Sequence, residues 1–243
     1  MLPKAKVCLS PMLLPTLKIE DSNVVVIDIL RATTCMCAAL DNGAEFIVPV
    51  REVEVCEQYR LLGYLCGAER NGIPIPEFDF GNSPFSYNTP KVRGAKIAMT
   101  TTNGTQAIHA AKSAHQILIG AFSNMTILTE YLKTQSKEVI LLCSGWKNRV
   151  NLEDTVFAGA MITALQGSYD PIDDAAMLSL TLYKCAVADK RFYIKNSSHF
   201  TKLISLNLQE DVKYCLRKDT HPVIPVFDED KLVPLPFGEQ VHV

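Results

Sequence analysis

Short apolar runs alternate with stretches of helical periodicity through the first two thirds of the chain. Residues 24–27 are four consecutive β-branched residues, a pattern typical of a strand covered on both faces. Small apolar residues then recur at helical spacing from Ala32, and Asn42-Gly43 favours a left-handed helix stop. This part of the chain is therefore predicted to form a strand, a turn and a helix, with Asp28 and Arg31 in the turn.

The same alternation continues beyond this unit. It predicts further strands at 45–50, 64–67, 96–100, 116–120 and 139–143, and helices at 53–62, 104–112, 124–133 and 152–165. From about residue 167 the chain is more helical, over 173–188 and 198–216, and it closes with apolar stretches at 223–227 and 232–235. We therefore expect one α/β domain, 1–243, with three α/β/α layers and a mostly parallel sheet. Ligands of such sheets bind at the carboxyl ends of the strands.

Composition narrows the classes of function. The 243 residues carry 24 Lys plus Arg against 26 Asp plus Glu, scattered along the chain, which argues against nucleic-acid binding and a polybasic membrane anchor. No apolar run approaches the roughly 20 residues that span a bilayer. The 8 cysteines include no CxxC pair, which fits a reducing compartment. We expect a cytoplasmic protein whose partners include neither nucleic acid nor membrane.

Polar residues follow the predicted strands, where a ligand would bind. Asp28 ends an apolar strand, and a buried carboxylate there needs compensation, either from an ion pair with Arg31 or from a role as metal ligand or nucleophile. Glu69 and Arg70 open a long segment rich in Gly, Pro and Asn, 67–84, as loops at functional sites often do. A surface ion pair between Glu69 and Arg70 is the alternative.

Two further segments allow both a structural and a functional interpretation. The run from Thr100 to Gly104 indicates either helix capping by Thr102 or Asn103 or an anion site made of hydroxyls and helix amides. Asn151 and Asp154 have the spacing of a capping box, so the carboxylates there either complement the helix dipole or belong to the site.

Missing motifs limit the choice of cofactor. Neither GxGxxG nor GxxxxGK[ST] occurs, which weakens dinucleotide and P-loop nucleotide binding, and no HExxH pattern supports zinc. Carboxylates at strand ends, with hydroxyls and arginines nearby, suit a hard ion such as Mg²⁺. This ion usually takes one or two carboxylates plus phosphate oxygens.

Six sequence blocks, in order, resemble the 2-phosphosulfolactate phosphatase family. They are DILRATTCMCAALDNGA, GAERNGIPIPEFDFGNSP, TTTNGTQAI, GAFSN, CSGWKNRVNLEDTVFAGA and SSHFTKLISLNLQEDVKYCLRKD, and they extend over about residues 24–226. The resemblance implies a Mg²⁺-dependent phosphatase that removes phosphate from 2-phospho-3-sulfolactate, a step of coenzyme M biosynthesis, on an α/β fold with its own topology.

The resemblance also assigns roles. It implies catalytic roles for Asp28, Arg31, Glu153 and Asp154, and metal binding by Asp28, Glu69, Glu153 and Asp154. It implies substrate binding by Thr33, Thr34, Arg70, Asn82, Ser83, Thr101, Thr102, Asn103, Gly104 and Arg149. Two segments depart from the family pattern: Phe200-Thr201, followed by Lys202, stands where Gly-Arg is expected, and Gly145-Trp146-Lys147-Asn148 replaces a smaller turn. These departures affect the expected substrate more than the expected chemistry.

Several alternatives remain open on the sequence. We favour direct attack by water on phosphorus over an aspartyl phosphate on Asp28, because Leu30 stands where haloacid-dehalogenase phosphatases need a second Asp. The substrate could instead be another phosphorylated hydroxy acid, or the protein could bind a small polyanion without catalysis. The expected partner is a small anionic phosphate ester, and a homodimer is left open.

Overall fold

A computed structural model gives the fold and describes residues 1–237. The strands are β1 (Lys4–Cys8), β2 (Asn23–Ile27), β3 (Phe46–Pro49), β4 (Leu65–Arg70), β5 (Ile73–Pro74), β6 (Lys96–Thr100), β7 (Gln116–Gly120), β8 (Val139–Cys143), β9 (Asp170–Pro171), β10 (Pro225–Asp228) and β11 (Lys231–Pro234). The helices are α1 (Ala32–Asp41), α2 (Val53–Leu61), α3 (Gly104–Ala110), α4 (Met125–Lys133), α5 (Leu152–Ala164), α6 (Asp174–Ala186), α7 (Lys190–Ile194), α8 (Ser198–Ser205) and α9 (Gln209–Cys215). Short 3₁₀ turns lie at η1 (Pro11–Thr16), η2 (Pro84–Tyr87), η3 (Pro90–Val92) and η4 (Phe122–Asn124).

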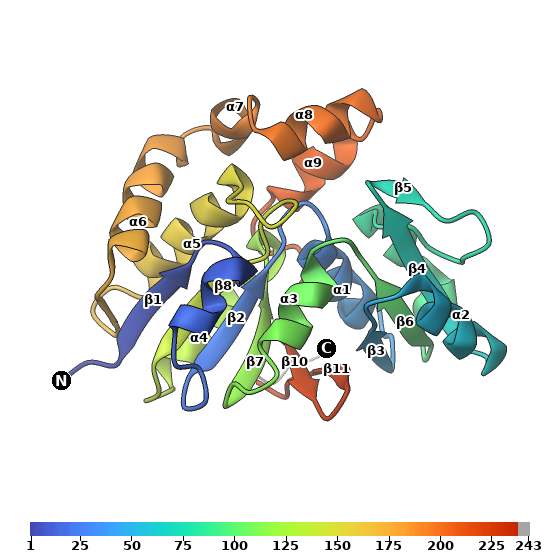
Figure 1. The fold of residues 1–243 in the computed structure, drawn as a ribbon, viewed down its shortest axis with the longest axis horizontal. Helices are drawn as coiled ribbons and strands as arrows, with labels where there is room; N and C mark the ends of the chain where they lie inside the picture. The colour runs from blue at the N-terminus through green and yellow to red at the C-terminus, as the bar shows by residue number, and fades with distance from the viewer. Residues whose placement is uncertain (238–243) are drawn as a thin grey trace, which may run out of the picture.

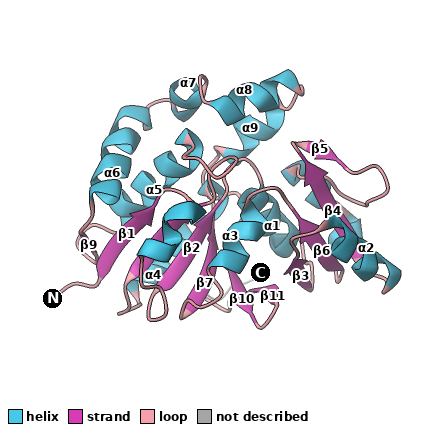
Figure 2. Ribbon diagram, viewed as in Figure 1, coloured by secondary structure: helices cyan, strands magenta, loops and turns pink. Residues whose placement is uncertain are grey.

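Within the described residues, one 11-stranded sheet runs through the molecule in the order β5-β4-β6-β3-β11-β10-β7-β2-β8-β1-β9 (Figure 1). The group β7-β2-β8-β1 is parallel, and so is the group β4-β6-β3. The antiparallel hairpin β10–β11 joins the two groups, pairing with β7 on one side and β3 on the other. Helices cover both faces of the sheet (Figure 2), so the expected α/β fold with a mostly parallel sheet is confirmed.

The core is built around β2 and α1. Every residue of β2 is buried, as its β-branched run predicts, and α1 is buried from Ala32 to Leu40. The small side chains of α1, mostly Ala, Cys and Thr, allow a helix to be enclosed almost all round. Both elements meet at Asp28, so the first polar group after β2 is held by one of the most tightly packed parts of the chain.

Three elements differ from the sequence expectation. Strand β1 was not predicted, because its alternation of Lys and apolar residues is short. Strand β4 continues past the expected end at residue 67 to Arg70, and it forms a hairpin with β5 inside the segment expected to be a loop. The helix expected over 198–216 is divided into α8 and α9 at Asn207, whose φ of 58° interrupts a helix.

The C-terminal helices form an arch above the sheet. Figure 1 shows α7, α8 and α9 passing over the carboxyl ends of the central strands, opposite the β4–β5 hairpin. Ser197 caps α8, since its hydroxyl oxygen accepts a hydrogen bond from the Phe200 amide at 3.1 Å. No helix among residues 1–237 is long and apolar enough to cross a membrane. The arch and the strand ends together enclose the candidate site.

Candidate active site

A cavity of about 450 Å³ lies between the carboxyl end of β2 and the arch. Its lining comes from the end of β2, the β4–β5 turn, the loops after β6 and β8, and α8. The residues that line it are Asp28, Leu30, Arg31, Glu69, Asn71, Gly72, Ile73, Asn82, Thr102, Asn103, Trp146, Lys147, His199, Lys202 and Leu203. Polar groups of both charges therefore converge where the sheet topology predicted a ligand site.

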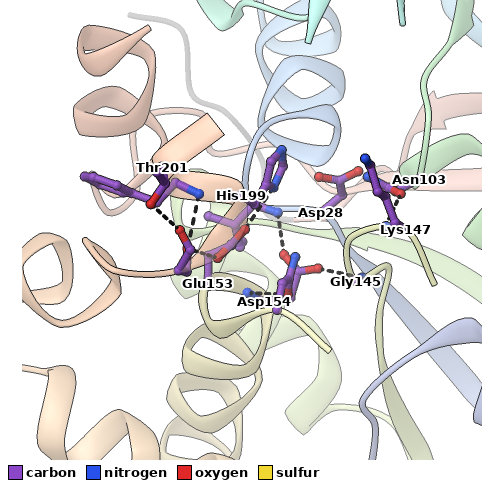
Figure 3. A network of polar contacts seen from close by, with 12 residues as sticks. Asp28, Asn103, Gly145, Lys147, Glu153, Asp154, His199 and Thr201 are labelled. Atoms are coloured by element: carbon purple, nitrogen blue, oxygen red, sulfur yellow. Dashed lines mark hydrogen bonds and ion pairs between the residues drawn. The ribbon is translucent and has the colours of Figure 1, made fainter. Parts of the chain in front are cut away.

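Asp28 is the acidic group at the floor of this cavity. Its carboxylate lies, in the view of Figure 3, between His199 on one side and Asn103 and Lys147 on the other. The residue is 3% exposed, and burial raises the pKa of Asp28 to about 6; the charge of His199 lowers this pKa, and the charge of Glu69 raises it. Asp28 is thus a carboxylate whose ionisation would be favoured by a cation in the cavity.

Gly104 permits the loop after β6 to approach Asp28. A Cβ added at Gly104 would lie 3.0 Å from the Asp28 carboxylate oxygen Oδ2. The backbone of Asp28 is fixed by Thr33, whose hydroxyl donates to the Asp28 carbonyl at 2.8 Å and accepts from the Asp28 amide at 3.1 Å. Local packing therefore determines both where the Asp28 carboxylate lies and how closely the loop after β6 approaches it.

Arg31 does not pair with Asp28. Its guanidinium forms a buried ion pair with Asp211 of α9 and donates from Nη2 to the Gly72 carbonyl at 3.4 Å. The interpretation of Asp28 and Arg31 as an ion pair is therefore wrong, because the side chain of Arg31 extends to the arch instead. Its Nε is buried without a hydrogen-bond partner, so one donor of this cavity-lining residue remains free.

Glu69 is held rigidly at the cavity wall. Its Oε1 accepts from the Thr102 amide at 2.8 Å and from the Thr102 hydroxyl at 2.9 Å, and its Oε2 accepts from the Gly72 amide at 2.6 Å. Thr102 therefore contacts Glu69 and does not cap α3, and Asn103 at the cap position makes no side-chain capping bond. The capping interpretation of these two residues is wrong.

His199 enters the cavity from the arch and was not among the predicted site residues. Its Nδ1 donates to Glu153 Oε1 at 2.9 Å, and the Ser197 hydroxyl donates to the other carboxylate oxygen, Oε2, at 3.2 Å. The Trp146 ring stacks on the imidazole with centroids 5.6 Å apart and an interplanar angle of 13°. The hydrogen bond to Glu153 therefore fixes one edge of the imidazole, and the Trp146 ring covers one of its faces. Figure 3 shows the hydrogen-bond network beside Asp28.

Comparisons with known proteins identify the family of this chain. A model of the family described as 2-phosphosulpholactate phosphatase matches residues 8–230. The chain belongs to the 2-phosphosulfolactate phosphatase family. A probable 2-phosphosulfolactate phosphatase of Thermotoga petrophila is 36% identical over 211 residues, covering 87% of this chain and 91% of the relative. One of Clostridium novyi is 36% identical over 220 residues, with 88% and 93% covered, and one of Thermotoga maritima is 35% identical over 211 residues, with 87% and 91% covered.

In this member of the 2-phosphosulfolactate phosphatase family, Asp154 lies behind the cavity wall. It is fully buried, its Oδ1 accepts from the Ile29 amide at 2.9 Å, and its Oδ2 accepts from the Gly145 amide at 3.0 Å. Burial, together with the charges of Asp28 and Glu153, raises the pKa of Asp154. Asn151 caps α5, with its side-chain oxygen accepting from the Asp154 amide at 3.3 Å, so the helix cap that this spacing predicted is confirmed, whereas the Asp154 carboxylate bonds the Ile29 and Gly145 amides and does not complete a capping box. Asp154 thus joins the loops after β2 and β8.

The side chains of Arg70 and Glu69 lie on opposite faces of β4, although the two residues are neighbours in sequence. Successive residues of a strand point to opposite faces, so β4 directs Arg70 away from the cavity that Glu69 lines. The Arg70 guanidinium donates to the Glu69 carbonyl at 2.8 Å and to the Thr100 hydroxyl at 3.2 Å, and it lines a separate surface hollow with Arg51. No ion pair between Glu69 and Arg70 forms.

The other predicted substrate-binding residues divide into two groups. Asn82, Thr102 and Asn103 line the cavity, and the buried Oδ1 of Asn82 has no hydrogen-bond partner. Five others lie outside it: Thr33, Thr34 and Thr101 bond to nearby backbone, Ser83 precedes η2, and Arg149 lines a separate hollow beside Trp146. The site residues that the sequence did not predict are His199, Trp146, Lys147, Lys202 and Asp211.

The expected metal ligands are also divided. Among residues 1–237, no group of three or more His, Cys, Asp or Glu side chains is arranged to hold a metal ion. Asp28 and Glu69 line the cavity, whereas Glu153 and Asp154 do not. The carboxylate oxygens of Glu69, Glu153 and Asp154 all accept the protein hydrogen bonds described above. This donor set fits an ion held by one or two carboxylates, with substrate oxygens completing its coordination.

Proposed function

We propose that this protein hydrolyses the phosphate monoester of 2-phospho-3-sulfolactate to 3-sulfolactate and phosphate, with Mg²⁺ as cofactor. Family membership supports the reaction. The structural observation that carries it is the Asp28 carboxylate, which is buried in the cavity and has no ion-pair partner among the described residues. Burial destabilises the ionised form of such a carboxylate, and a bound cation stabilises that form. The reaction would belong to coenzyme M biosynthesis.

The cavity has the charges that such a substrate requires. The substrate carries a phosphate, a sulfonate and a carboxylate, and Arg31, Lys147 and Lys202 line the same cavity. The free Nε of Arg31 supplies a buried donor for one anionic oxygen. Lys147 and Lys202 lie in the two segments that depart from the family pattern, so they are the residues that would adjust the fit of the carboxylate and the sulfonate.

Asp28, with Glu69 beside it, would hold Mg²⁺ against the phosphoryl oxygens. The ion, when bound, neutralises charge on these oxygens and lowers the pKa of a coordinated water. Glu69 is kept in place by the Thr102 and Gly72 amides, so its position does not depend on the ion. We favour direct attack of water on phosphorus, in which Asp28 keeps its role as a ligand throughout. In the alternative, Asp28 itself attacks and an aspartyl phosphate is hydrolysed in a second step.

Phosphate release from 2-phosphosulfolactate by the purified protein tests the proposal. Treatment with EDTA should abolish release, and excess Mg²⁺ should restore it. Unchanged turnover after chelation would contradict the Mg²⁺ requirement. Binding detected by calorimetry without any release would favour a polyanion-binding protein, and faster release from 2-phospholactate or a phosphoglycerate would favour a different hydroxy-acid substrate.

A further inference from the structure

Among residues 1–237, two buried histidines are each bonded to a carboxylate, and they differ in one respect. His221 donates from Nδ1 to Asp41 at 2.8 Å, and its Nε2 is bonded to the Tyr214 hydroxyl at 2.8 Å, so both of its ring nitrogens have protein partners. His199 is bonded only through Nδ1, to Glu153. Its ring lines the cavity, and among residues 1–237 its Nε2 has no protein partner.

The contacts of His199 determine what its Nε2 can do. A carboxylate only accepts hydrogen bonds, so the proton on the Glu153 side belongs to Nδ1, and Nε2 is the ring nitrogen left to bond a ligand in the cavity. Glu153 is fully buried and its second oxygen accepts from Ser197, which prevents the carboxylate from rotating away. Trp146 covers one face of the imidazole. The ring is therefore held in one orientation, and among residues 1–237 its Nε2 is the nitrogen without a protein partner in this cavity-lining residue.

We propose that His199 is the general acid that protonates the leaving oxygen of the phosphate ester, and that Glu153 is its positioning residue. This inference rests on the proposed phosphatase function. The leaving group of the expected substrate is a secondary alkoxide, which is too basic to depart readily without a proton. Positioned proton transfer to such a group typically contributes 10²- to 10⁴-fold to a rate.

The step is balanced as follows. The bond between phosphorus and the bridging oxygen breaks, its electron pair stays on that oxygen, and the oxygen takes the proton from Nε2 of the charged imidazole. The phosphoryl group passes to the attacking nucleophile, which in the favoured route is water. The proton that water releases replaces, through solvent, the one that His199 has given. The net reaction is ester plus water to alcohol plus phosphate.

The arrangement assigns the two sides of the cavity different tasks. Asp28 and Glu69, on the strand side, would hold the cation that neutralises phosphoryl charge, whereas His199 and Lys202 come from α8. An ester lying between them would have its phosphorus toward the strands and its bridging oxygen toward the arch.

The experiment compares two leaving groups. His199→Asn retains a donor near the position of Nδ1 for Glu153 and removes Nε2, so the fold should persist. Turnover of 2-phosphosulfolactate should fall by about 10²- to 10⁴-fold. Turnover of p-nitrophenyl phosphate should fall by less than about tenfold, because nitrophenolate departs without a proton. Glu153→Gln should shift the ratio of the two rates in the same direction by a smaller factor, and His221→Asn is the matched control that should leave the ratio unchanged.

A second measurement uses the alkyl substrate alone. The kinetic isotope effect of ¹⁸O at the bridging position should increase in His199→Asn, because the oxygen then departs with uncompensated negative charge. Equal losses on both substrates with an unchanged isotope effect would overturn the proposal and leave His199 a binding or structural role. An unchanged rate on 2-phosphosulfolactate would overturn it outright. Failure of the proposed function is distinguishable, since the unaltered protein would then release no phosphate from 2-phosphosulfolactate.

Discussion

The two sides of the cavity are built in different ways. On the strand side, carboxylates are held by backbone amides: Glu69 by those of Gly72 and Thr102, and Asp154 by those of Ile29 and Gly145. On the arch side, the polar contacts are between side chains, and they include the pairs Arg31 with Asp211 and Glu153 with His199. The strand-side carboxylates are therefore held by backbone amides, whereas these contacts of the arch depend on charged side-chain pairs.

This difference shows how the site acquires both acidic and basic groups. The parallel strands bring carboxylates to one edge of the sheet, where burial, together with the smaller effect of the charges of Glu69 and Glu153, raises the pKa of Asp28. The arch contributes His199 and Lys202, so the complementary charges arrive from a part of the chain far away in sequence. The site is complete only when the arch is docked. Variants on the strand side and variants on the arch side should therefore lose activity for different reasons.

The largest expected effect is that of Asp28→Asn on the strand side. Turnover should fall by several orders of magnitude, because the variant removes the negative charge that holds the cation. Partial rescue at high Mg²⁺ would identify Asp28 as a weakened ligand, whereas a lost nucleophile would not be rescued. Asp21→Asn, at an exposed position before β2, is the matched control and should retain normal turnover.

The same variant should be more stable than the parent protein at neutral pH in EDTA. Folding raises the pKa of Asp28 from 3.8 to about 6, so the folded state favours the protonated carboxyl. That contribution is complete below pH 3.8 and is lost as pH rises to about 6, and the difference is on the order of 1 to 3 kcal/mol. Asn does not ionise, so denaturant midpoints should favour the variant at pH 7.5 and converge at pH 4. Lower stability at pH 7.5 would contradict this account.

Asp211→Asn should weaken the arch side by breaking the buried ion pair with Arg31. The side chains of Arg31 and Asp211 are 3% and 8% exposed, and breaking such a buried pair leaves an uncompensated charge at a cost of about 3 to 5 kcal/mol. Thermal unfolding and kcat/KM should both decrease. Glu210→Gln, at the adjacent exposed ion pair with Lys213, should change neither quantity appreciably.

A double variant separates stability from function in this pair. Arg31→Met with Asp211→Leu replaces both charges by apolar groups of similar size, which is often neutral or stabilising for a buried pair. The melting temperature should therefore recover while turnover stays low. Recovery of both would show that Arg31 serves only to dock the arch.

Sequence periodicity predicted most of the sheet and the place of the site, because both are local properties. The run at 24–27 became the fully buried strand β2, and Asp28 came out at its carboxyl end facing a cavity. Asn151 capped α5 as its spacing suggested. In each case the controlling interactions lie within a few residues of one another, where patterns of one chain are informative.

The pairing of charged groups was not predictable in this way. Arg31 stands three positions after Asp28, yet its partner Asp211 lies 180 residues further along the chain. Similarly, Glu153 and His199 are separated by 46 residues, so no short histidine motif could reveal them. These pairs depend on how α8 and α9 fold back over the sheet. Short patterns in a single sequence do not show which distant elements pack together.

The smallest expected effect is that of Arg70→Gln. This variant tests whether only one face of β4, the face that carries Glu69, contributes to activity. Arg70 contacts backbone and hydroxyl oxygens on the face opposite the cavity, and its guanidinium lines the hollow that contains Arg51. Its loss should change kcat/KM by less than about tenfold, equivalent to roughly 1.4 kcal/mol. Arg31→Gln, in the cavity, should reduce the same parameter far more, by about 10²-fold or greater. Steady-state kinetics of both variants on 2-phosphosulfolactate provide the measurement. Comparable losses would mean that Arg70 reaches the substrate after all, and that β4 serves the site from both of its faces.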